Sequence, residues 1–535
     1  MQQKSFLAIA FLATTLAMPT RAIAQKHAFL PPTMGWSSWN TFALDISEKL
    51  ICAQADAMVE KGLDKVGYKY INIDDGFWDG RGRDGQLRIN KQRFPNGMKA
   101  VADYIHSKGL KAGIYSDAGN NTCGSGSGQK AYGRDVGLAG HEDQDLNLYF
   151  VDWGYDFIKV DFCGGNDLGL DERKQYTKIG EAIKRCEKKT GRKLVYNVCR
   201  WDYPGTWISS VADSWRTTYD IADYWSSVKG IIKQNLYIQA YTGGGHYNDM
   251  DMLEIGRRMS NDEDRTHMAY WCIASSPLLI GCDLTNLQDE SLALLKNPGL
   301  LAMNQDALGL GAPVAQREGE VYVVAKDMER LHGSKRAVVV MNLSDRTQSV
   351  SVDLRKLQMA GQVTMHDVFT GDDILVSGSC DVTVPAHGSQ AFLVTGQRID
   401  KDVYEAEEAW CQDYQELENR MNAKPMEAPS ASGGTYMGFV GGKATNSLEW
   451  RDVYVSKGGY YKLTIRYASG KDRDLSVSVN GKQLKTFENL NTGSWDNQWS
   501  VVTVKAHLKS GSNAVCLGNA DAFAPNIDCM KVEKM

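Results

Sequence analysis

The chain has 535 residues, 23% of them charged, and a formal net charge of −5. This length suits two to four domains, and the dispersed basic residues give no indication of nucleic acid or an anionic membrane surface as a partner. Aromatic residues make up 10% of the chain. Such rings serve both sugar binding and large cores, so only the placement of individual rings can separate the two uses.

A targeting signal is predicted at the start of the chain. Lys4 precedes an apolar run from Phe6 to Met18, and Ala22-Ile23-Ala24 offers a cleavage site of small residues. The apolar run is too short to span a bilayer. We therefore expect residues 1–24 to be a signal peptide, and the mature protein to be periplasmic or extracellular without a membrane span. Export permits disulfides, and the odd count of 11 cysteines leaves at least one without an intramolecular partner.

Eight short strand candidates alternate with amphipathic helical stretches over roughly 250 residues. The candidate strands are Met34–Trp39, Tyr70–Ile73, Ala112–Tyr115, Phe157–Val160, Leu194–Asn197, Ser214–Arg216, Gly245–Asn248 and Leu278–Ile280, and the clearest helical patterns are Ser47–Val66, Met98–Lys108 and Asp171–Thr190. Eight repeats of strand and helix predict a (β/α)₈ barrel. We expect this domain to cover residues 25–307.

The stretch from Tyr155 to Cys163 carries the first candidate for chemistry. Its apolar run has the length and β-branched content of a buried strand, and it ends in Asp161. Lys159 points to the same face, because side chains alternate along a strand, and its charge is expected to keep Asp161 ionised. Asp161 is then either a nucleophile at the mouth of the barrel or a strand-end acid that caps the next helix.

Polar and aromatic residues also follow the other candidate strands. These are Trp36 and Trp39, Asp74-Asp75, Ser116-Asp117, Cys199 and Trp201, Arg216 and Asp220, and Asp249 and Asp251. Barrel enzymes carry their active sites at the carboxyl ends of the strands. Helix capping explains any one of these acids, but it explains poorly why seven successive strands end this way.

After about Leu308 the helical periodicity disappears. Short strands at Val321–Val324, Ala337–Met341, Ser349–Val352 and Gln390–Val394 predict an antiparallel β domain over residues 308–398. A third unit, residues 402–535, shows an alternating strand at Gly458–Tyr467 and a hairpin with an Asn480-Gly481 turn. The expected fold is therefore α/β, a TIM barrel followed by an antiparallel β domain and a β-sandwich (jelly-roll) module, docked together.

Seven motifs in order resemble those of glycoside hydrolase family 27, the α-galactosidases and their relatives, over residues 30–310. They are Met34–Asn40, Ile73–Gly76, Arg93–Gly97, His106–Lys111 followed by Gly113–Tyr115, Lys159–Asp161, Trp215–Ile221 and Asn248–Leu253. The resemblance implies that Asp161 is the nucleophile and Asp220 the acid/base. Family members retain anomeric configuration, which requires two carboxyls about 5–5.5 Å apart. Asp220 must begin protonated, so its surroundings are expected to raise its pKa.

The resemblance also implies a set of sugar contacts. They are Trp39, Asp74, Asp75, Tyr115, Cys123, Lys159, Cys199, Trp201, Arg216 and Asp251. Among them, Asp74 and Asp75 correspond to acceptors for the 4- and 6-hydroxyls of galactose, and Cys123 and Cys163 to a disulfide behind Asp161. Trp201 is bulky enough to exclude a 2-acetamido group. Arg200 stands where some members carry Glu, which leaves its effect on the aglycone open.

The third unit resembles carbohydrate-binding modules of families 6 and 35, on Tyr404–Glu407 at its start and Asn526–Met530 at its end. The resemblance implies that Glu405, Glu407 and Asp528 hold a structural calcium ion, for which carboxylates are suitable ligands. An ordinary acidic strand end is the alternative. Trp495, in a polar loop, either stacks on a sugar or packs in the core.

The sequence thus predicts a retaining exo-α-galactosidase that removes terminal α-linked galactose from oligo- or polysaccharides without a catalytic cofactor. A β-L-arabinopyranosidase of the same fold is an alternative, although two acids at Asp74-Asp75 favour a substrate with a 6-hydroxyl. A non-catalytic glycan-capturing protein is a second alternative, which the presence of both catalytic aspartates disfavours. A divalent-metal hydrolase ranks last, because only nine His are present and they form no cluster. The oligomeric state is open.

Overall fold

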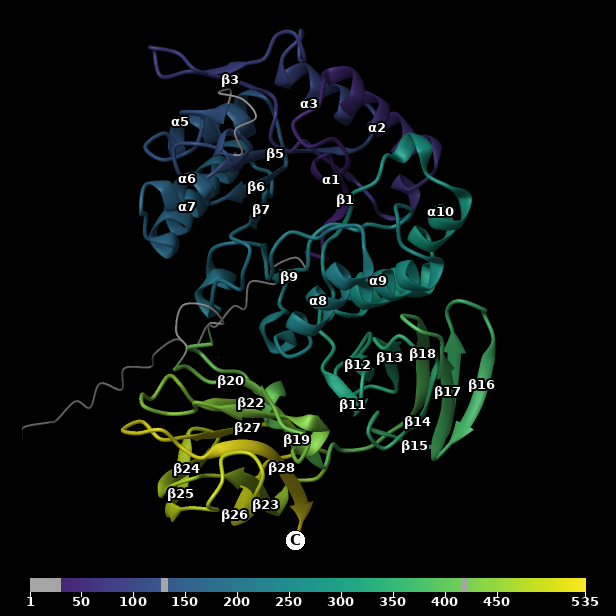
Figure 1. Cartoon of the computed structure of the whole chain (residues 1–535), viewed down its shortest axis with the longest axis vertical. Helices are drawn as coiled ribbons and strands as arrows, with labels where there is room; N and C mark the ends of the chain where they lie inside the picture. Colours follow the sequence, from purple (N-terminus) through teal and green to yellow (C-terminus); the bar gives the residue numbers. More distant parts are fainter. Residues whose placement is uncertain (1–29, 127–132, 415–420) are drawn as a thin grey trace, which may run out of the picture.

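The computed structural model describes residues 30–126, 133–414 and 421–535, so the predicted signal peptide lies outside the described residues. Figure 1 shows three units in chain order: a barrel with helices around it, and two all-β units side by side at one end of it. This arrangement confirms the predicted fold class.

Eight parallel strands form the sheet of the first unit. They are β1 (Met34–Ser37), β2 (Tyr70–Asn72), β5 (Lys111–Asp117), β6 (Phe157–Asp161), β7 (Val195–Val198), β8 (Ser214–Arg216), β9 (Tyr247–Asp249) and β10 (Leu278–Ile280), in the order β10-β1-β2-β5-β6-β7-β8-β9. The segment after β9 closes the ring, because Leu253 N donates to Leu279 O at 2.7 Å and Gly281 N donates to Leu253 O at 2.9 Å. The eight predicted strands are therefore the eight strands of the barrel.

The helices of this unit begin and end at recognisable signals. α7 (Glu172–Thr190) starts after Asp171, whose side chain accepts from Lys174 N, and ends at Gly191 with φ 67°. The predicted helix at Ser47–Val66 stops earlier, because α2 (Glu48–Glu60) is followed by Gly62 with φ 65°. The other helices are α1 (Trp39–Phe42), α3 (Met98–Ser107), α4 (Cys123–Gly126), α5 (Glu142–Asn147), α6 (Cys163–Asp167), α8 (Trp225–Asn235), α9 (Asn261–Ile273), α10 (Asp289–Leu295) and α11 (Pro298–Asn304).

Shorter elements fill the connections of the barrel. The hairpin of β3 (Trp78–Arg81) and β4 (Leu87–Ile89) follows β2, and single turns of other helix types lie at η1 (Asp64–Val66), η3 (Leu148–Asp152), η4 (Thr206–Ser210), η5 (Gln239–Tyr241) and η6 (Leu284–Asn286). Within the residues that the structure describes, no helix combines the length and the apolar character that a membrane crossing requires.

The second unit is antiparallel throughout. Its strands are β11 (Val314–Glu318), β12 (Val321–Asp327), β13 (Lys335–Asn342), β14 (Gln348–Asp353), β15 (Met359–Asp367), β16 (Asp373–Ser377), β17 (Ser379–Val384) and β18 (Ser389–Arg398). Six of them form a sheet in the order β11-β12-β13-β18-β15-β16, and β14 pairs with β17. The four strands predicted from the sequence correspond to β12, β13, β14 and β18.

The third unit is a sandwich of two antiparallel sheets. One has the order β20 (Lys424–Glu427), β21 (Thr435–Gly438), β28 (Asn526–Lys534), β23 (Gly459–Ala468) and β26 (Ser500–Leu508), with β19 (Val403–Glu405) also on β28. The other has the order β22 (Leu448–Val455), β27 (Gly511–Gly518), β24 (Arg473–Val479) and β25 (Lys482–Leu490). The turns η7 (Ala406–Glu408) and η8 (Ser432–Gly434) complete it. Asn480 and Gly481, with φ 49° and 76°, form the predicted hairpin turn.

Aromatic side chains dock the third unit on the barrel. The rings of Tyr241 and Tyr414 are stacked with centroids 5.1 Å apart, and Tyr203 lies 5.7 Å from Tyr414. Thr206 Oγ1 donates to Gln412 O at 2.6 Å. The units are therefore packed against one another and not merely tethered, as the sequence predicts.

Candidate active site

β6 places Lys159 and Asp161 on the inner face of the barrel. Lys159 Nζ lies 3.5 Å from Asp161 Oδ1, and the hydroxyl of Tyr115, on the neighbouring strand β5, donates to Asp161 Oδ2 at 2.9 Å. The thiol of Cys199 also donates to Asp161. A buried carboxylate at the carboxyl end of a barrel strand is thus held by side chains from β5, from β6 and from the residue that follows β7.

Burial governs the pKa of Asp161. The pKa of this carboxyl is raised above its ordinary value by desolvation first, and Lys159 lowers it only in part. Asp74 and Asp220 raise it further through their negative charge. Lys159 therefore lowers the pKa of Asp161, as the sequence predicts, but the barrel interior and the neighbouring acids outweigh this one ammonium.

Asp220 lies in the loop after β8, close to a buried arginine. Arg216 Nη2 is 3.1 Å from Asp220 Oδ1 and 2.7 Å from Asp251 Oδ2. The side chain of Asp220 is 58% exposed, whereas Arg216 and Asp251 are buried. Ile221 N donates to Asp251 Oδ2 at 2.9 Å, which fixes the backbone next to Asp220. Asp220 is thus held beside Arg216 with more than half of its side chain open to solvent.

Asp74 and Asp75 follow β2 and differ in their partners. Asp74 Oδ2 accepts from Lys159 Nζ at 3.0 Å, and Asp74 Oδ1 accepts from Asp75 N at 2.9 Å. Asp75 Oδ2 accepts from Gly124 N at 3.0 Å, and the side chain of Thr122 also donates to Asp75. Burial raises the pKa of Asp75 to about 6. Both oxygens of Asp74 are thus partnered without a sugar, whereas no cation of the described residues pairs with Asp75.

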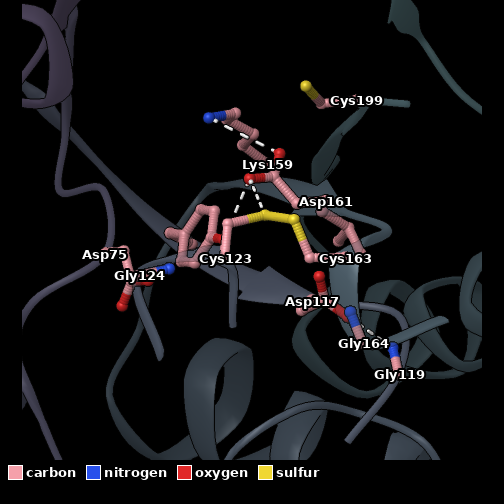
Figure 2. The surroundings of a disulfide bond; sticks show 12 residues. Asp75, Asp117, Gly119, Cys123, Gly124, Lys159, Asp161, Cys163, Gly164 and Cys199 are labelled. Carbon is pink, nitrogen blue, oxygen red and sulfur yellow. Dashed lines mark hydrogen bonds and ion pairs between the residues drawn. A yellow bond between two sulfur atoms is a disulfide. The ribbon is translucent and has the colours of Figure 1, made fainter. Parts of the chain in front are cut away.

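The disulfide between Cys123 and Cys163 is present, as the resemblance implies, and joins α4 to α6. Figure 2 shows it next to the carboxylate of Asp161, with Asp75, Gly124 and Asp117 around it. Cys123 Sγ lies 3.3 Å from Asp161 Oδ2. The bridge therefore braces both the segment that carries Asp161 and the backbone N–H that binds Asp75. The other nine cysteines are unpaired.

The loop after β7 carries Cys199, Arg200 and Trp201. Arg200 Nε lies 2.5 Å from Glu172 Oε2, and Arg200 Nη1 lies 3.6 Å from Asp202. The arginine is therefore held by acids beside the loop. Trp201 is half-buried with φ 67°, a left-handed conformation that is rare for a bulky residue and marks a constrained loop. Trp39, half-buried, is the first residue of α1 at the opposite side of the ring of strands.

Two site residues escape the sequence prediction. Asn197, inside β7, donates to Asp249 Oδ2 at 2.7 Å, and Asp249 Oδ1 accepts from Asp251 N at 2.9 Å. These contacts hold the backbone of Asp251, which in turn pairs with Arg216. The second is Asp117, at the end of β5. Strand alternation alone could have indicated Asn197, but the role of Asp117 depends on the register between β5 and β6.

The acids of the third unit lie together. Ser432 Oγ donates to Glu405 Oε1 at 2.7 Å, Ser432 N donates to Asp528 Oδ1 at 2.8 Å, and Arg466 pairs with Asp528 Oδ2. Glu405 Oε2 and Glu407 Oε2 are buried without a hydrogen-bond partner among the described residues. Burial raises the pKa of Glu405 to about 7 and that of Glu407 well above its ordinary value. Of these acids, only Glu405 and Asp528, together with Cys529, have ligand atoms within 4.8 Å of one another, and both oxygens of Asp528 already have donors. The three acids therefore fit a hard cation such as calcium only in part.

A family model described as α-galactosidase A matches residues 31–306, and one described as the α-galactosidase C-terminal β-sandwich domain matches residues 318–394. The chain belongs to the α-galactosidase family. It is therefore a glycoside hydrolase, and the resemblance to glycoside hydrolase family 27 is confirmed. Both matches end before the third unit, so its likeness to carbohydrate-binding modules stays a prediction.

Similar proteins support this membership. "Alpha-galactosidase A" of Cellvibrio japonicus is 37% identical over 404 residues, which cover 70% of this chain and 95% of that protein. The structure of α-galactosidase I from Mortierella vinacea has a TM-score of 0.64 and 27% identity, over 70% of this chain and all of that one. The structure of a β-L-arabinopyranosidase from Geobacillus stearothermophilus in complex with arabinose has a TM-score of 0.60 and 25% identity. The match covers 69% of this chain and 98% of that one.

Proposed function

We propose that this enzyme is a retaining exo-α-galactosidase in which Asp161 attacks the anomeric carbon and Asp220 protonates the leaving group. The observation that carries the proposal is the contrast between the two carboxyls. Asp161 is buried among Lys159, Tyr115 and Cys199, whereas Asp220 is 58% exposed in a loop at the mouth of the barrel. A nucleophile beneath the sugar and an acid with access to solvent suit double displacement, because water must reach the second step.

The remaining acids suit a galactose unit. Asp74 and Asp75 supply acceptors for the 4- and 6-hydroxyls, and Arg216 with Asp251 supplies a buried charged pair for hydroxyls on the opposite side. Buried acceptors of this kind reject sugars that lack the matching hydroxyl. Trp39 provides a ring for the apolar face of the sugar, and Trp201 fills the space that a 2-acetamido group needs. No cofactor is required, since both steps use carboxyl groups of the chain.

The third unit is proposed to be a carbohydrate-binding module that holds calcium at Glu405, Glu407 and Asp528, and the protein is proposed to be exported. The orphaned oxygens of Glu405 and Glu407 support the metal. Trp495 is 39% exposed, but Arg473 lies 4.3 Å from its ring and Gly470 packs against it. Its ring therefore has less free surface for a sugar than the sequence suggests.

The alternative of a β-L-arabinopyranosidase is less favoured, because the curated relatives at 37% identity are α-galactosidases. Aryl α-galactoside, β-L-arabinopyranoside and α-N-acetylgalactosaminide substrates separate the candidates. We expect turnover of the α-galactoside with α-galactose as the first product in NMR spectra. First release of the β-anomer would contradict retention, and faster turnover of the arabinopyranoside would contradict the galactose assignment. A protein that binds α-galactosides without turnover would be a glycan-capturing protein.

A further inference from the structure

Asp117 is a buried acid beside the active site to which the mechanism assigns no role. It is the last residue of β5 and the register partner of Asp161 on β6. Its Oδ1 accepts from Gly119 N at 2.6 Å and from Gly164 N at 3.1 Å. Gly119 follows β5, whereas Gly164 lies in α6, directly after the segment that carries Asp161. One oxygen atom thus ties together the turns that follow two neighbouring strands, as Figure 2 shows.

The two turns are also packed backbone to backbone. A Cβ atom on Gly119 would lie 1.8 Å from the carbonyl carbon of Gly164, so only glycine permits this approach. Ala118 N donates to Asp161 O at 2.8 Å. The main chain of Asp161 is therefore held from the turn after β5, and that turn is closed by the Asp117 carboxylate.

The same carboxyl lies against the disulfide. A carboxylate oxygen of Asp117 and the sulfur atoms of Cys123 and Cys163 all lie within 4.8 Å of one another. Asp117 Oδ2 is buried and has no hydrogen-bond partner among the described residues. The backbone N–H groups of Gly119 and Gly164 both donate to Oδ1, and that of Cys163 also interacts with this carboxyl. An amide oxygen in place of Oδ1 would accept from the same pair.

We propose that Asp117 is a positioning residue for the nucleophile: by holding the turn after β5 against the segment after β6, its Oδ1 sets the place of Asp161 relative to the anomeric carbon. The inference rests on the proposed role of Asp161. It differs from a general contribution to stability, because it predicts a loss in the step that Asp161 performs and no loss in sugar binding at Asp74 and Asp75.

The test compares Asp117→Ala with Asp117→Asn. The rate of covalent trapping by an activated fluoro-galactoside reports attack by Asp161, and inhibition by galactose reports binding. We expect Asp117→Ala to lower the trapping rate at least 100-fold, while the inhibition constant changes less than about threefold. Asp117→Asn should stay within about tenfold of wild type, because its carbonyl oxygen accepts from Gly119 and Gly164 as before.

Asp156→Ala is the matched control, because Asp156 Oδ2 accepts from Ala112 N at 3.1 Å and so joins β5 and β6 at their opposite ends. It should leave the trapping rate unchanged. An equal loss in this control, or normal trapping in a folded Asp117→Ala variant, would overturn the proposal. If Asp117→Ala does not fold, the test uses Asp117→Asn alone. A 100-fold loss of the trapping rate in a stably folded Asp117→Asn variant would then overturn the proposal, and a retained trapping rate would support it. Full activity in Asp161→Asn would instead refute the proposed nucleophile itself.

Discussion

Lys159 and Asp74 form a partly buried ion pair over the intervening strand β5, with Nζ and Oδ2 3.0 Å apart. The ammonium comes from β6 and the carboxylate from the turn after β2. Since Lys159 also faces Asp161, a single cation serves both the acid proposed to bind the sugar and the acid proposed to attack it. Removing either partner therefore changes substrate binding and nucleophile chemistry together.

Lys159→Met should destabilise the fold by about 3 kcal/mol near pH 8, because two buried acids lose their cation. Without Lys159 the pKa of Asp161 rises further, so the destabilisation is full above that raised value and shrinks as the pH falls through it. Urea unfolding at pH 8 and pH 5 measures the difference. Lys99→Met, which removes an exposed pair with Asp103, should show little change at either pH. An equal loss at both pH values would contradict the ion-pair explanation.

Asp161→Asn should abolish turnover, because an amide cannot form the glycosyl ester, and should leave the fold intact. Burial raises the pKa of Asp161, so ionising this carboxyl destabilises the folded wild type. This destabilisation is absent below the ordinary carboxyl pKa and reaches its full size above the raised pKa. The variant should therefore gain stability relative to wild type as the pH rises from 4 to 8. Thermal unfolding across this range checks the sign, and a falling difference would show that the wild-type pKa is depressed.

Asp220→Ala should lose turnover of substrates with poor leaving groups by several orders of magnitude and retain glycosylation by activated aryl galactosides. Azide needs no general base, so it should restore turnover and give a galactosyl azide. Asp223→Ala offers a control in the same loop, since Asp223 pairs with Arg257 and Arg258 and not with Arg216. Absence of rescue and of an azide product would remove Asp220 from the acid/base role.

Calcium should stabilise the third unit. With calcium at 100 times its dissociation constant, the expected gain is about 2.7 kcal/mol. Chelation should lower the unfolding midpoint of this unit, and Glu407→Gln should make it insensitive to calcium. Glu427→Gln, which changes an exposed acid of the same unit, should respond as wild type does. A calcium response that persists in Glu407→Gln would place the ion elsewhere.

The sequence was most informative where one physical cause decides the outcome. Parallel strands buried on both faces are continuous apolar runs, so Phe157–Val160 and its seven counterparts could be located, and alternation placed Lys159 beside Asp161. β16 was missed because Ile374 and Leu375 are exposed, so the strand lacks a regular pattern of buried and exposed residues. The cation that pairs with Asp74 lies on β6, and one of the two donors to Asp117 lies in α6, far along the chain in both cases. No local pattern carries that register, which is why the ion pair of Asp74 with Lys159 could not be predicted from the sequence.

Substrate choice should depend on Asp74 and Asp75 in different ways. Asp74 is already bonded to Lys159 and to Asp75 N, so a pentopyranoside does not leave it orphaned. Asp75 has no cationic partner in the part of the chain that the structure describes, and burial raises its pKa to about 6. We therefore expect Asp74→Asn to lower kcat/KM on α-galactoside and β-L-arabinopyranoside alike, through the lost partner of Lys159.

Asp75→Asn then shows which sugar hydroxyl donates a hydrogen bond to Asp75. A loss confined to the galactoside would assign Asp75 to the 6-hydroxyl, which the arabinopyranoside lacks, and a loss on both substrates would assign it to the 4-hydroxyl. Wild type should prefer the galactoside at least about tenfold, since one unmade hydrogen bond to a buried carboxylate costs about 1–3 kcal/mol and 1.4 kcal/mol is one decade. A galactoside-specific loss in Asp74→Asn would show instead that Lys159 releases Asp74 to the sugar when substrate binds.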